Sequence, residues 1–314
     1  MRVLVAGCAG FIGFHLCERL LADGHEVVGV DNLASGQRRN ADDLARMPGF
    51  RFVEHDIRQP LPSAVVEGRP EAIFNLACPA SPVDFGTRPL EILAVCSRGL
   101  WNLLDLAREL GARLLQTSTS EVYGDPLEHP QRETYWGNVN PVGPRSCYDE
   151  GKRFGEALIA AYRRQYRTPL RVARIFNTYG PRMRADDGRA LPSFISQALS
   201  GRPLTVHGDG RQTRSFCYVA DQVEGLLRLA ASEVEEPVNI GNPVEVTMGE
   251  VAREVIDLAG SSSRIVHADR LPDDPRVRCP DISRARTLLG WEPHVDRREG
   301  LLRTIAWFRQ AENV

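Results

Sequence analysis

The 314-residue sequence predicts an α/β protein, with a Rossmann-like doubly wound parallel sheet and a smaller C-terminal α/β lobe. In the first half, short β-branched runs alternate with amphipathic stretches, which is the pattern of strand–helix–strand units in a parallel sheet. After about residue 180, prolines separate shorter elements and the alternation ends. We therefore expect a first domain over residues 1–176 and a second lobe over 177–314, interleaved with the first because no flexible linker divides them.

The elements follow in chain order from hydrophobic periodicity. Runs rich in valine, isoleucine and leucine predict buried strands, and apolar residues spaced three and four apart predict helices. The long segment 89–110, for example, repeats leucine at helical spacing. The predicted strands are 2–6, 26–31, 51–55, 71–75, 112–117 and 170–176, and the predicted helices are 11–23, 89–110, 147–167, 221–231, 248–259 and 296–310.

Composition and charge narrow the classes of partner. The net charge of -2 gives no overall attraction to nucleic acid or to an anionic membrane. No apolar run reaches the roughly 18 residues of a membrane span. The seven cysteines are scattered and lack metal-ligand spacing, which is typical of reduced thiols. We therefore expect a cytoplasmic protein with no metal, no nucleic-acid partner and no membrane association.

A glycine-rich turn follows the first predicted strand. The stretch GCAGFIG (residues 7–13) runs into a predicted helix, and Asp31 ends the next strand. Glycines allow a pyrophosphate to approach the backbone at a helix N-terminus, and a carboxylate at the end of the second strand accepts hydrogen bonds from a ribose. This predicts a dinucleotide site with a preference for NAD, although Arg38 and Arg39 leave NADP open. The alternative is a structural turn in which Asp31 only caps the loop.

The second motif is CYDEGK, which places Tyr148 and Lys152 on one face of a predicted helix. A nearby ammonium, together with an oxidised nicotinamide, would lower the pKa of the tyrosine. The phenolate could then take a proton from a substrate hydroxyl as a hydride leaves for the cofactor. A surface Tyr/Lys pair is the plain alternative, but its position after a dinucleotide turn favours the catalytic interpretation.

Taken together, the motifs resemble a known family. The stretches GCAGFIG, VDN, TSTSEVYGDP, YDEGK and RIFNTYGPRM are similar to the extended short-chain dehydrogenases/reductases that act on nucleotide sugars. Longer stretches are similar to the UDP-glucuronate decarboxylase branch: LACPASP, HPQRETYWGNVNPVGPRSCYDEGKR, DDGRALPSFI, GDGRQTRSF and DDPRVRCPDI. The resemblance implies oxidation of UDP-glucuronate at C4 by catalytic NAD, loss of CO2 from the 4-keto acid, and return of the hydride to give UDP-xylose.

The resemblance also assigns roles to residues. Thr119, Tyr148 and Lys152 would oxidise the sugar, Glu121 would position it and manage protons near C5, and Arg278 would assist decarboxylation. The implied cofactor-binding residues are Gly7, Gly10, Phe11, Ile12, Gly13, Asp31, Asn32, Asp56, Ile57, Leu76, Tyr148 and Lys152. The implied substrate-binding residues are Asn177, Arg189, Arg214 and Arg278.

Three other functions remain as alternatives. A 4,6-dehydratase of this family carries an aspartate where Ser120 stands, and serine is a poor acid for expelling water. A UDP-glucuronate 4-epimerase generally lacks a residue like Glu121. A non-catalytic NAD-sensing scaffold would not need Thr119, Tyr148 and Lys152 together.

The chain also departs from the family in places. Cys8 stands for a glycine, Cys78 for a common serine, Cys96 for a frequent asparagine and Leu100 for a threonine. We expect Cys96 to be a buried apolar thiol rather than a redox switch. The resemblance further implies a homodimer through a four-helix bundle of segments 89–110 and 147–167. Its apolar face would contain Leu93, Leu100, Leu104, Phe154, Leu158, Ala161 and Tyr162.

Overall fold

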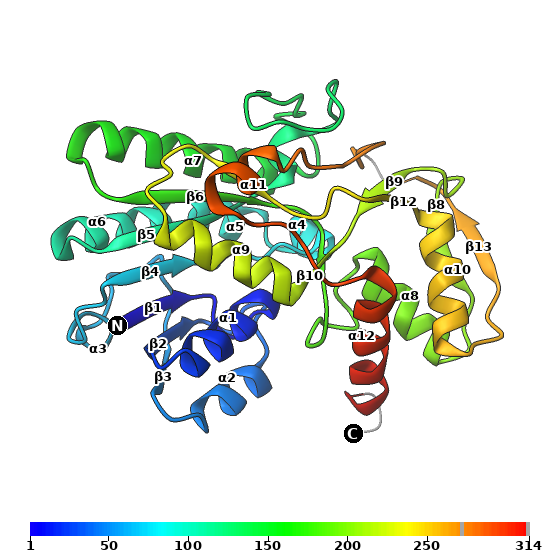
Figure 1. Cartoon of the computed structure of the whole chain (residues 1–314), viewed down its shortest axis with the longest axis horizontal. Coiled ribbons are helices and arrows are strands. Elements are labelled where there is room, and N and C mark those ends of the chain that lie inside the picture. The colour runs from blue at the N-terminus through cyan, green and yellow to red at the C-terminus, as the bar shows by residue number, and fades with distance from the viewer. Residues whose placement is uncertain (271–272, 312–314) are drawn as a thin grey trace.

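The computed structural model describes residues 1–270 and 273–311, so the predicted second lobe is seen without residues 271–272 and 312–314. Its centre is a seven-stranded sheet in the order β11-β6-β5-β4-β1-β2-β3, with every neighbouring pair parallel (Figure 1). This confirms the predicted doubly wound α/β class. The strands are β1 (Arg2–Ala6), β2 (Glu26–Asp31), β3 (Phe50–Glu54), β4 (Ala72–Asn75), β5 (Arg113–Thr119), β6 (Leu170–Ile175) and β11 (Val238–Ile240).

Helices cover both faces of the sheet. One face carries α1 (Phe11–Ala22), α2 (Arg38–Ala45) and α9 (Val219–Ala231), whose apolar residues join one core. The other face carries α6 (Leu100–Leu110) and α7 (Ser146–Tyr166), which pack into a second core. The smaller α3 (Ser63–Val66) and α4 (Pro82–Thr87) lie in the connections after β3 and β4.

The predicted helix 89–110 is not regular throughout. It consists of α5 (Pro89–Ala94), a π-helical turn η1 (Val95–Gly99) and α6. A π-turn inserts an extra residue into a helix and is frequent at functional sites. Here it places Cys96 toward α7, where a Cβ on Gly151 would lie 3.2 Å from the Cys96 sulfur.

The second lobe lies beside the carboxyl edge of the sheet, at the right of Figure 1. Its helices are α8 (Ala190–Leu199), α10 (Met248–Ala259) and α12 (Arg297–Ala311). Its strand pairs are β8 (Leu204–His207) with β13 (Ile265–Ala268), and β9 (Thr213–Ser215) with β12 (Glu245–Thr247). A further short pair, β7 (Thr178–Tyr179) with β10 (Cys217–Tyr218), lies between the lobes, and α11 (Ser283–Leu289) returns to the first lobe beside α9 and β11.

Several elements were not predicted: the helices α2, α3, α4, α8 and α11, and the strands from β7 to β13. The α8 helix contains Pro192, but this proline lies in the first turn, where its missing N–H is not needed. The α11 helix is only seven residues long, too short for a clear periodic pattern. Strand β11 comes from the second half of the chain and still pairs with β6 at the edge of the main sheet.

The predicted apolar face of the helical bundle needs correction. Four of its seven residues pack inside this chain, because the helices must cover the sheet before they can meet a partner: Leu100, Leu104, Leu158 and Tyr162 are 1%, 0%, 8% and 5% exposed. Leu93 and Phe154 remain 40% and 45% exposed, and Trp101, which was not predicted, is 47% exposed.

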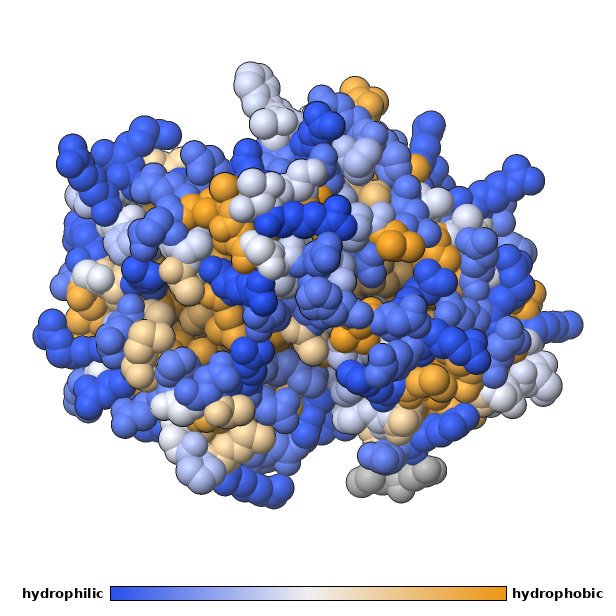
Figure 2. Space-filling model, in the orientation of Figure 1, coloured by the Kyte–Doolittle hydropathy of each residue, from blue (hydrophilic) through white to orange (hydrophobic). Residues whose placement is uncertain are grey.

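The surface in Figure 2 is mostly hydrophilic, with apolar groups in separate patches rather than in a continuous belt. Among the described residues, none of the helices has both the length and the hydrophobicity that a membrane span requires. Within the same residues, no group of three or more histidine, cysteine, aspartate or glutamate side chains is arranged to hold a metal ion.

Candidate active site

Two adjoining cavities open at the carboxyl ends of the sheet strands, the larger between the lobes and the smaller within the first lobe. Open α/β sheets bind ligands at this edge. The larger has a volume of about 580 Å³ and is lined by the glycine turn, by Thr119, Glu121 and Tyr148, and by residues of the second lobe. The smaller, of about 80 Å³, is lined by Asp31 and the loops after β2 and β3. Together they collect the predicted cofactor and substrate residues in one place.

The glycine turn is closely packed against the neighbouring strand. Gly7 has a φ of +84°, and a Cβ there would lie 2.7 Å from the Leu76 carbonyl carbon. A Cβ on Gly13 would lie 2.0 Å from the Gly7 oxygen, so both positions require glycine. Helix α1 begins after Gly10 without a capping side chain from the described residues. The first-turn N–H groups of Phe11 and Ile12 therefore lie at a cavity wall where an anionic pyrophosphate fits.

Asp31 closes the other end of this site. Its carboxylate accepts hydrogen bonds from the backbone N–H of Ala9 (3.0 Å) and Leu33 (2.8 Å), and burial raises its pKa. Gly36 leaves the space beside it, since a Cβ there would lie 2.7 Å from an Asp31 carboxylate oxygen. A fixed carboxylate in this position suits the ribose hydroxyls of NAD.

The neighbouring loop completes the small cavity. The Asn32 amide donates to Asp56 (3.1 Å), and Ile57 and Leu76 contribute apolar walls. Arg58, which sequence reasoning missed, donates to Asp56 through its side chain and lowers the pKa of that carboxyl to about 2.

Arg38 and Arg39, the two arginines that left NADP open as the cofactor, both have partners within the chain. Arg38 donates to Glu54, and the Arg39 guanidinium lies 4.7 Å from the Trp307 ring. Neither contact directs a cation at Asp31, so the site's chemistry favours NAD.

The oxidising residues meet at the end of β5. Tyr148, on α7, is stacked against Phe85 with ring centroids 5.0 Å apart. The Lys152 ammonium lies 5.6 Å from the centre of the Tyr148 ring and donates to the Thr117 carbonyl (2.9 Å). Thr119 ends β5 and lines the same cavity. The helical spacing and the strand end therefore bring the three residues together, as expected.

Burial dominates the pKa of Tyr148. Burial raises it, Lys152 lowers it and contact with Thr119 lowers it further, but burial prevails and the pKa is about 12. In the protein chain alone, desolvation of the phenolate therefore outweighs one ammonium. The predicted lowering depends on an oxidised nicotinamide as well, so it stays a prediction for the cofactor-bound enzyme. The positive charge of an oxidised nicotinamide would act in the same direction as Lys152.

Glu121 stands in a buried cluster with two arginines. Arg278 donates to both carboxylate oxygens of Glu121, once at 2.7 Å, and Arg145 donates to one of them at 2.7 Å. Burial raises the pKa of Glu121, but the two guanidinium groups outweigh it and hold the pKa at about 2. Glu121 is thus an anion at any working pH, and the cluster carries one net positive charge.

Arg145 and its neighbour Asp149 were both missed from the sequence. Arg145 comes three residues before Tyr148, within the stretch GPRSCYDEGKR, but its pairing with Glu121 depends on the turn between β5 and α7. Asp149 is buried, and one of its oxygens has no hydrogen-bond partner among the described residues. Burial and the charge of Glu121 raise the pKa of Asp149 to about 7.

The predicted substrate residues line the larger cavity from the second lobe. Arg214 is 8% exposed and donates to Asp274 (2.7 Å), a partner that was not predicted. Arg189 stands at the start of α8, 2.7 Å from Asp187, and Asn177 lies between β6 and β7. These side chains meet from separate loops, so the structure places them around one cavity together with Arg278.

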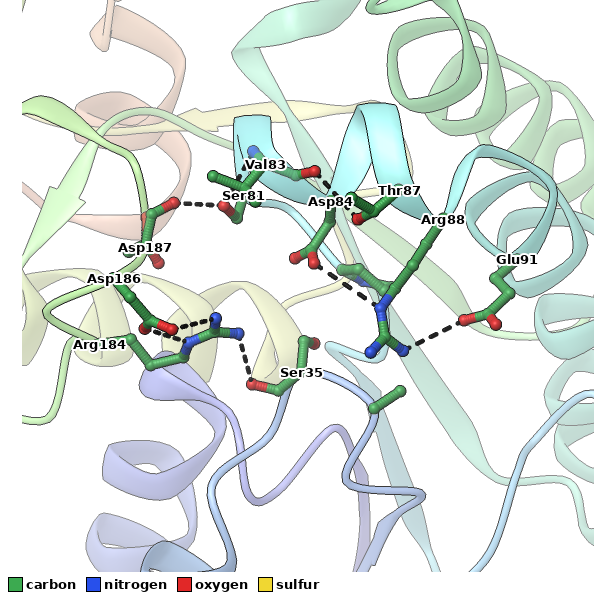
Figure 3. A network of polar contacts seen from close by, with 12 residues as sticks. Ser35, Ser81, Val83, Asp84, Thr87, Arg88, Glu91, Arg184, Asp186 and Asp187 are labelled. Atoms are coloured by element: carbon green, nitrogen blue, oxygen red, sulfur yellow. Dashed lines mark hydrogen bonds and ion pairs between the residues drawn. The ribbon is translucent and has the colours of Figure 1, made fainter.

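Polar contacts join the two lobes at the rim of this cavity (Figure 3). Arg184 pairs with Asp186 (2.9 Å) and donates to the Ser35 carbonyl (3.4 Å). Ser81 donates to the carbonyl of Asp187. The segment that precedes Arg189 is therefore attached to loops of the first lobe on both sides of the cavity.

Comparison with known proteins identifies the family. A family model described as GDP-mannose 4,6 dehydratase matches residues 4–304, so the chain belongs to this family of extended short-chain dehydrogenases/reductases. Within it, the chain belongs with the UDP-glucuronic acid decarboxylases. UDP-glucuronic acid decarboxylase 3 of Arabidopsis thaliana is 51% identical over 100% of this chain and 91% of its own length.

Solved structures have the same fold across the whole chain. UDP-glucose 4-epimerase of Thermotoga maritima, solved with UDP-glucose, has a TM-score of 0.92 and 29% identity, covering 99% of this chain and all of the other. UDP-glucuronic acid 4-epimerase of Bacillus cereus, solved with UDP-glucuronic acid and NAD, has a TM-score of 0.89 and 29% identity, again over 99% of this chain and all of the other.

Proposed function

We propose that this protein is an NAD-dependent decarboxylase that converts UDP-glucuronate to UDP-xylose through a 4-keto intermediate. The observation that carries the proposal is the buried cluster of Glu121, Arg278 and Arg145 beside Tyr148 on one cavity wall. A net positive charge there suits a sugar carboxylate, and the 51% identical relative bears the name of this activity.

When bound, NAD would supply the acceptor for the C4 hydride of the sugar and the source of its return. The residues present fit it: the glycine turn and the uncapped start of α1 suit the pyrophosphate, and Asp31 suits a ribose. The B. cereus neighbour was solved with NAD, which supports the same cofactor here. The rest of the proposed cofactor site is the smaller cavity, which is lined by Asn32, Asp56 and Leu76.

Tyr148 takes the proton of the C4 hydroxyl, and Thr119 orients that hydroxyl from the end of β5. Lys152 is fixed by the Thr117 carbonyl, so its charge stays beside the phenol throughout the cycle. Because burial holds the pKa of Tyr148 at about 12, the phenol keeps its proton until substrate and cofactor are both bound. After loss of CO2, C5 takes a proton from water, and when the hydride returns to C4 the same phenol gives its proton back to the C4 oxygen.

The carboxylate of the sugar is held by the arginine cluster. A free arginine fork would bind the carboxylate tightly and stabilise the ground state more than the transition state. Glu121 already occupies that fork, so Arg278 and Arg145 offer a diffuse positive charge in place of a strong ion pair. Glu121 therefore acts by positioning Arg278 and by moderating its charge. Arg189, Arg214 and Asn177 hold the UDP part from the second lobe.

The test is a turnover assay. Purified protein is incubated with UDP-glucuronate and catalytic NAD+, and CO2 and the sugar nucleotide are measured by mass. Equal amounts of CO2 and a UDP-pentose are expected. A UDP-hexuronate isomer without CO2 would make the protein a 4-epimerase, and a dehydrated product would make it a 4,6-dehydratase. Neither product, despite bound NAD, would favour an NAD-sensing scaffold.

We also propose that two copies pair through α5, α6 and α7 as a four-helix bundle. The exposed apolar side chains on these helices, Leu93, Trp101 and Phe154, support this. Mass measurement in solution tests it, and a monomer would refute it. All seven cysteines lie within the described residues and are free thiols, which supports our placement of the enzyme in the reducing cytoplasm.

A further inference from the structure

Two cysteines meet at the wall of the cofactor site. Cys78 lies in the loop after β4 and lines both cavities, whereas Cys96 lies on the π-helical turn η1 behind it. Their sulfur atoms are 3.6 Å apart and share a hydrogen bond in which either can be the donor. The residues are far apart in the sequence, and only the fold brings the thiols together.

This pair is next to the catalytic helix. Cys96 packs on α7 at Gly151, in the turn between Tyr148 and Lys152. Burial lowers the pKa of Lys152, but the charges of Cys78, Tyr148 and Cys96 raise it, so the thiols lie within electrostatic range of the ammonium. The hydrogen bond from Cys78 and the Lys152 charge lower the pKa of Cys96. The same hydrogen bond and burial raise the pKa of Cys78, so of the two sulfurs Cys96 favours the thiolate and Cys78 holds the shared proton.

We propose that Cys78 and Cys96 are a peroxide-sensitive dithiol that closes to a disulfide and thereby inhibits the enzyme reversibly. A peroxide entering the cavity meets Cys78 first, because that sulfur is at the wall. The shared hydrogen bond lets the thiolate form there by transfer of one proton.

The chemistry balances in two steps. The thiolate attacks one peroxide oxygen, the O–O bond breaks, and the sulfur becomes a sulfenic acid while hydroxide takes a proton and leaves as water. The second thiol then attacks that sulfur, the S–O bond breaks, and a disulfide and a second water form. Two thiols lose two electrons and two protons, and one peroxide is reduced to two waters. A dithiol reductant reverses the disulfide by thiol exchange.

Inhibition follows from the change in distance. A disulfide requires a sulfur separation of about 2.05 Å, so the two sulfur atoms must approach by more than an ångström, and this pulls the Cys78 loop toward η1. That loop follows Leu76 and Ala77, which form the wall of the cofactor site. A displacement of about 1 Å at a catalytic site can cost about a hundredfold in rate.

The test uses the holoenzyme with bound NAD and hydrogen peroxide as the probe. Both cysteines fall in the single tryptic peptide 59–98, because Arg69 and Arg88 each precede a proline and resist trypsin. After free thiols are blocked, the disulfide appears as an unblocked peptide that has lost two hydrogens. This readout does not depend on the proposed function, whereas the activity readout, CO2 release from UDP-glucuronate, rests on it.

We expect peroxide to lower the activity at least about tenfold in step with the disulfide, and dithiothreitol to restore it. Cys96→Ser should lose both the disulfide and the reversible inhibition, with each variant compared with its own untreated sample. Cys147→Ser is the matched control, because Cys147 is a buried thiol of the same cluster that donates to the Phe85 carbonyl. It should respond as wild type does.

Absence of the disulfide in treated wild-type protein would overturn the inference, whatever the variants do. A disulfide without loss of activity would overturn the inhibitory role. If untreated protein releases no CO2, the proposed function fails, and the peptide mass still decides whether the dithiol closes.

Discussion

A substitution at Glu121 distinguishes most clearly between an ion pair that only stabilises the fold and one that also serves catalysis. Glu121→Gln keeps the shape of the side chain and removes the charge that balances Arg278 and Arg145. The pKa of Glu121 falls from 4.5 to about 2 in the folded protein. This difference corresponds to about 3 kcal/mol of stability contributed by the ionised form at neutral pH. For a chain of this size we expect the melting temperature to fall by about 6 °C.

The lowered pKa of Glu121 also determines how this contribution to stability changes with pH. A carboxyl whose pKa is lowered by folding contributes its stability above its ordinary pKa, and the contribution disappears as the pH falls toward 2. When both proteins also carry Asp149→Asn, so that this neighbouring carboxyl does not titrate, the difference in unfolding free energy made by Glu121→Gln should be constant from pH 5.5 to pH 8, as urea titrations at several pH values would show.

Glu156 supplies a matched control. It also accepts two hydrogen bonds from one arginine, Arg174, at 2.9 Å and 2.7 Å, and it is similarly buried. Neither Glu156 nor Arg174 is among the described residues that line the larger cavity. Glu156→Gln should keep decarboxylation within about threefold, whereas Glu121→Gln should lose about a hundredfold in kcat. The reasoning is refuted if Glu121→Gln retains activity within tenfold, or if both variants lose it equally.

Tyr148→Phe should lower the rate of CO2 release by about a thousandfold, because the proton acceptor for the C4 hydroxyl is lost. The NAD content, measured by mass after denaturation, should stay unchanged. Loss of NAD from the variant would instead show that the phenol serves mainly to bind the cofactor. Asp31→Ala should weaken NAD binding about tenfold and reduce the discrimination against NADP, as fluorescence titration with each cofactor would measure; unchanged affinities would remove Asp31 from the ribose site. Because burial and the Glu121 charge raise the pKa of Asp149 to about 7, the ionised form is disfavoured in the folded state and wild-type stability should fall as the pH rises from 5 to 8. Asp149→Asn should flatten that slope in urea titrations, and an equal slope in both proteins would contradict the raised pKa.

The parts of the fold that follow from local pattern were predicted well. The first two strands have the predicted limits, 2–6 and 26–31, because continuous β-branched runs between turns specify a buried parallel strand. Periodicity also located α7 to within one residue. The π-turn η1 was not predicted, since an extra residue in a helix leaves the apolar spacing of the segment as a whole nearly unchanged.

The site was predictable only where a motif lies on one element. Tyr148 and Lys152 share a helix, so their spacing placed them together. The pairing of Arg145 with Glu121 and the contact of Cys78 with Cys96 join separate elements, and no local signal specifies which of many arginines or cysteines will meet. Cys96 is buried, as expected, but its sulfur has a polar partner that the sequence did not reveal.

Strand β11 has a consequence for the order in which a growing chain can fold. Strand β6, which lies next to the edge strand β11, is complete once residue 175 has been synthesised, but β11 is residues 238–240. Until the ribosome has released that later segment, β6 presents an open parallel edge to which another chain could pair. A nascent or truncated protein ending near residue 176 is therefore exposed to aggregation. The full sheet can form only after most of the polypeptide has left the exit tunnel.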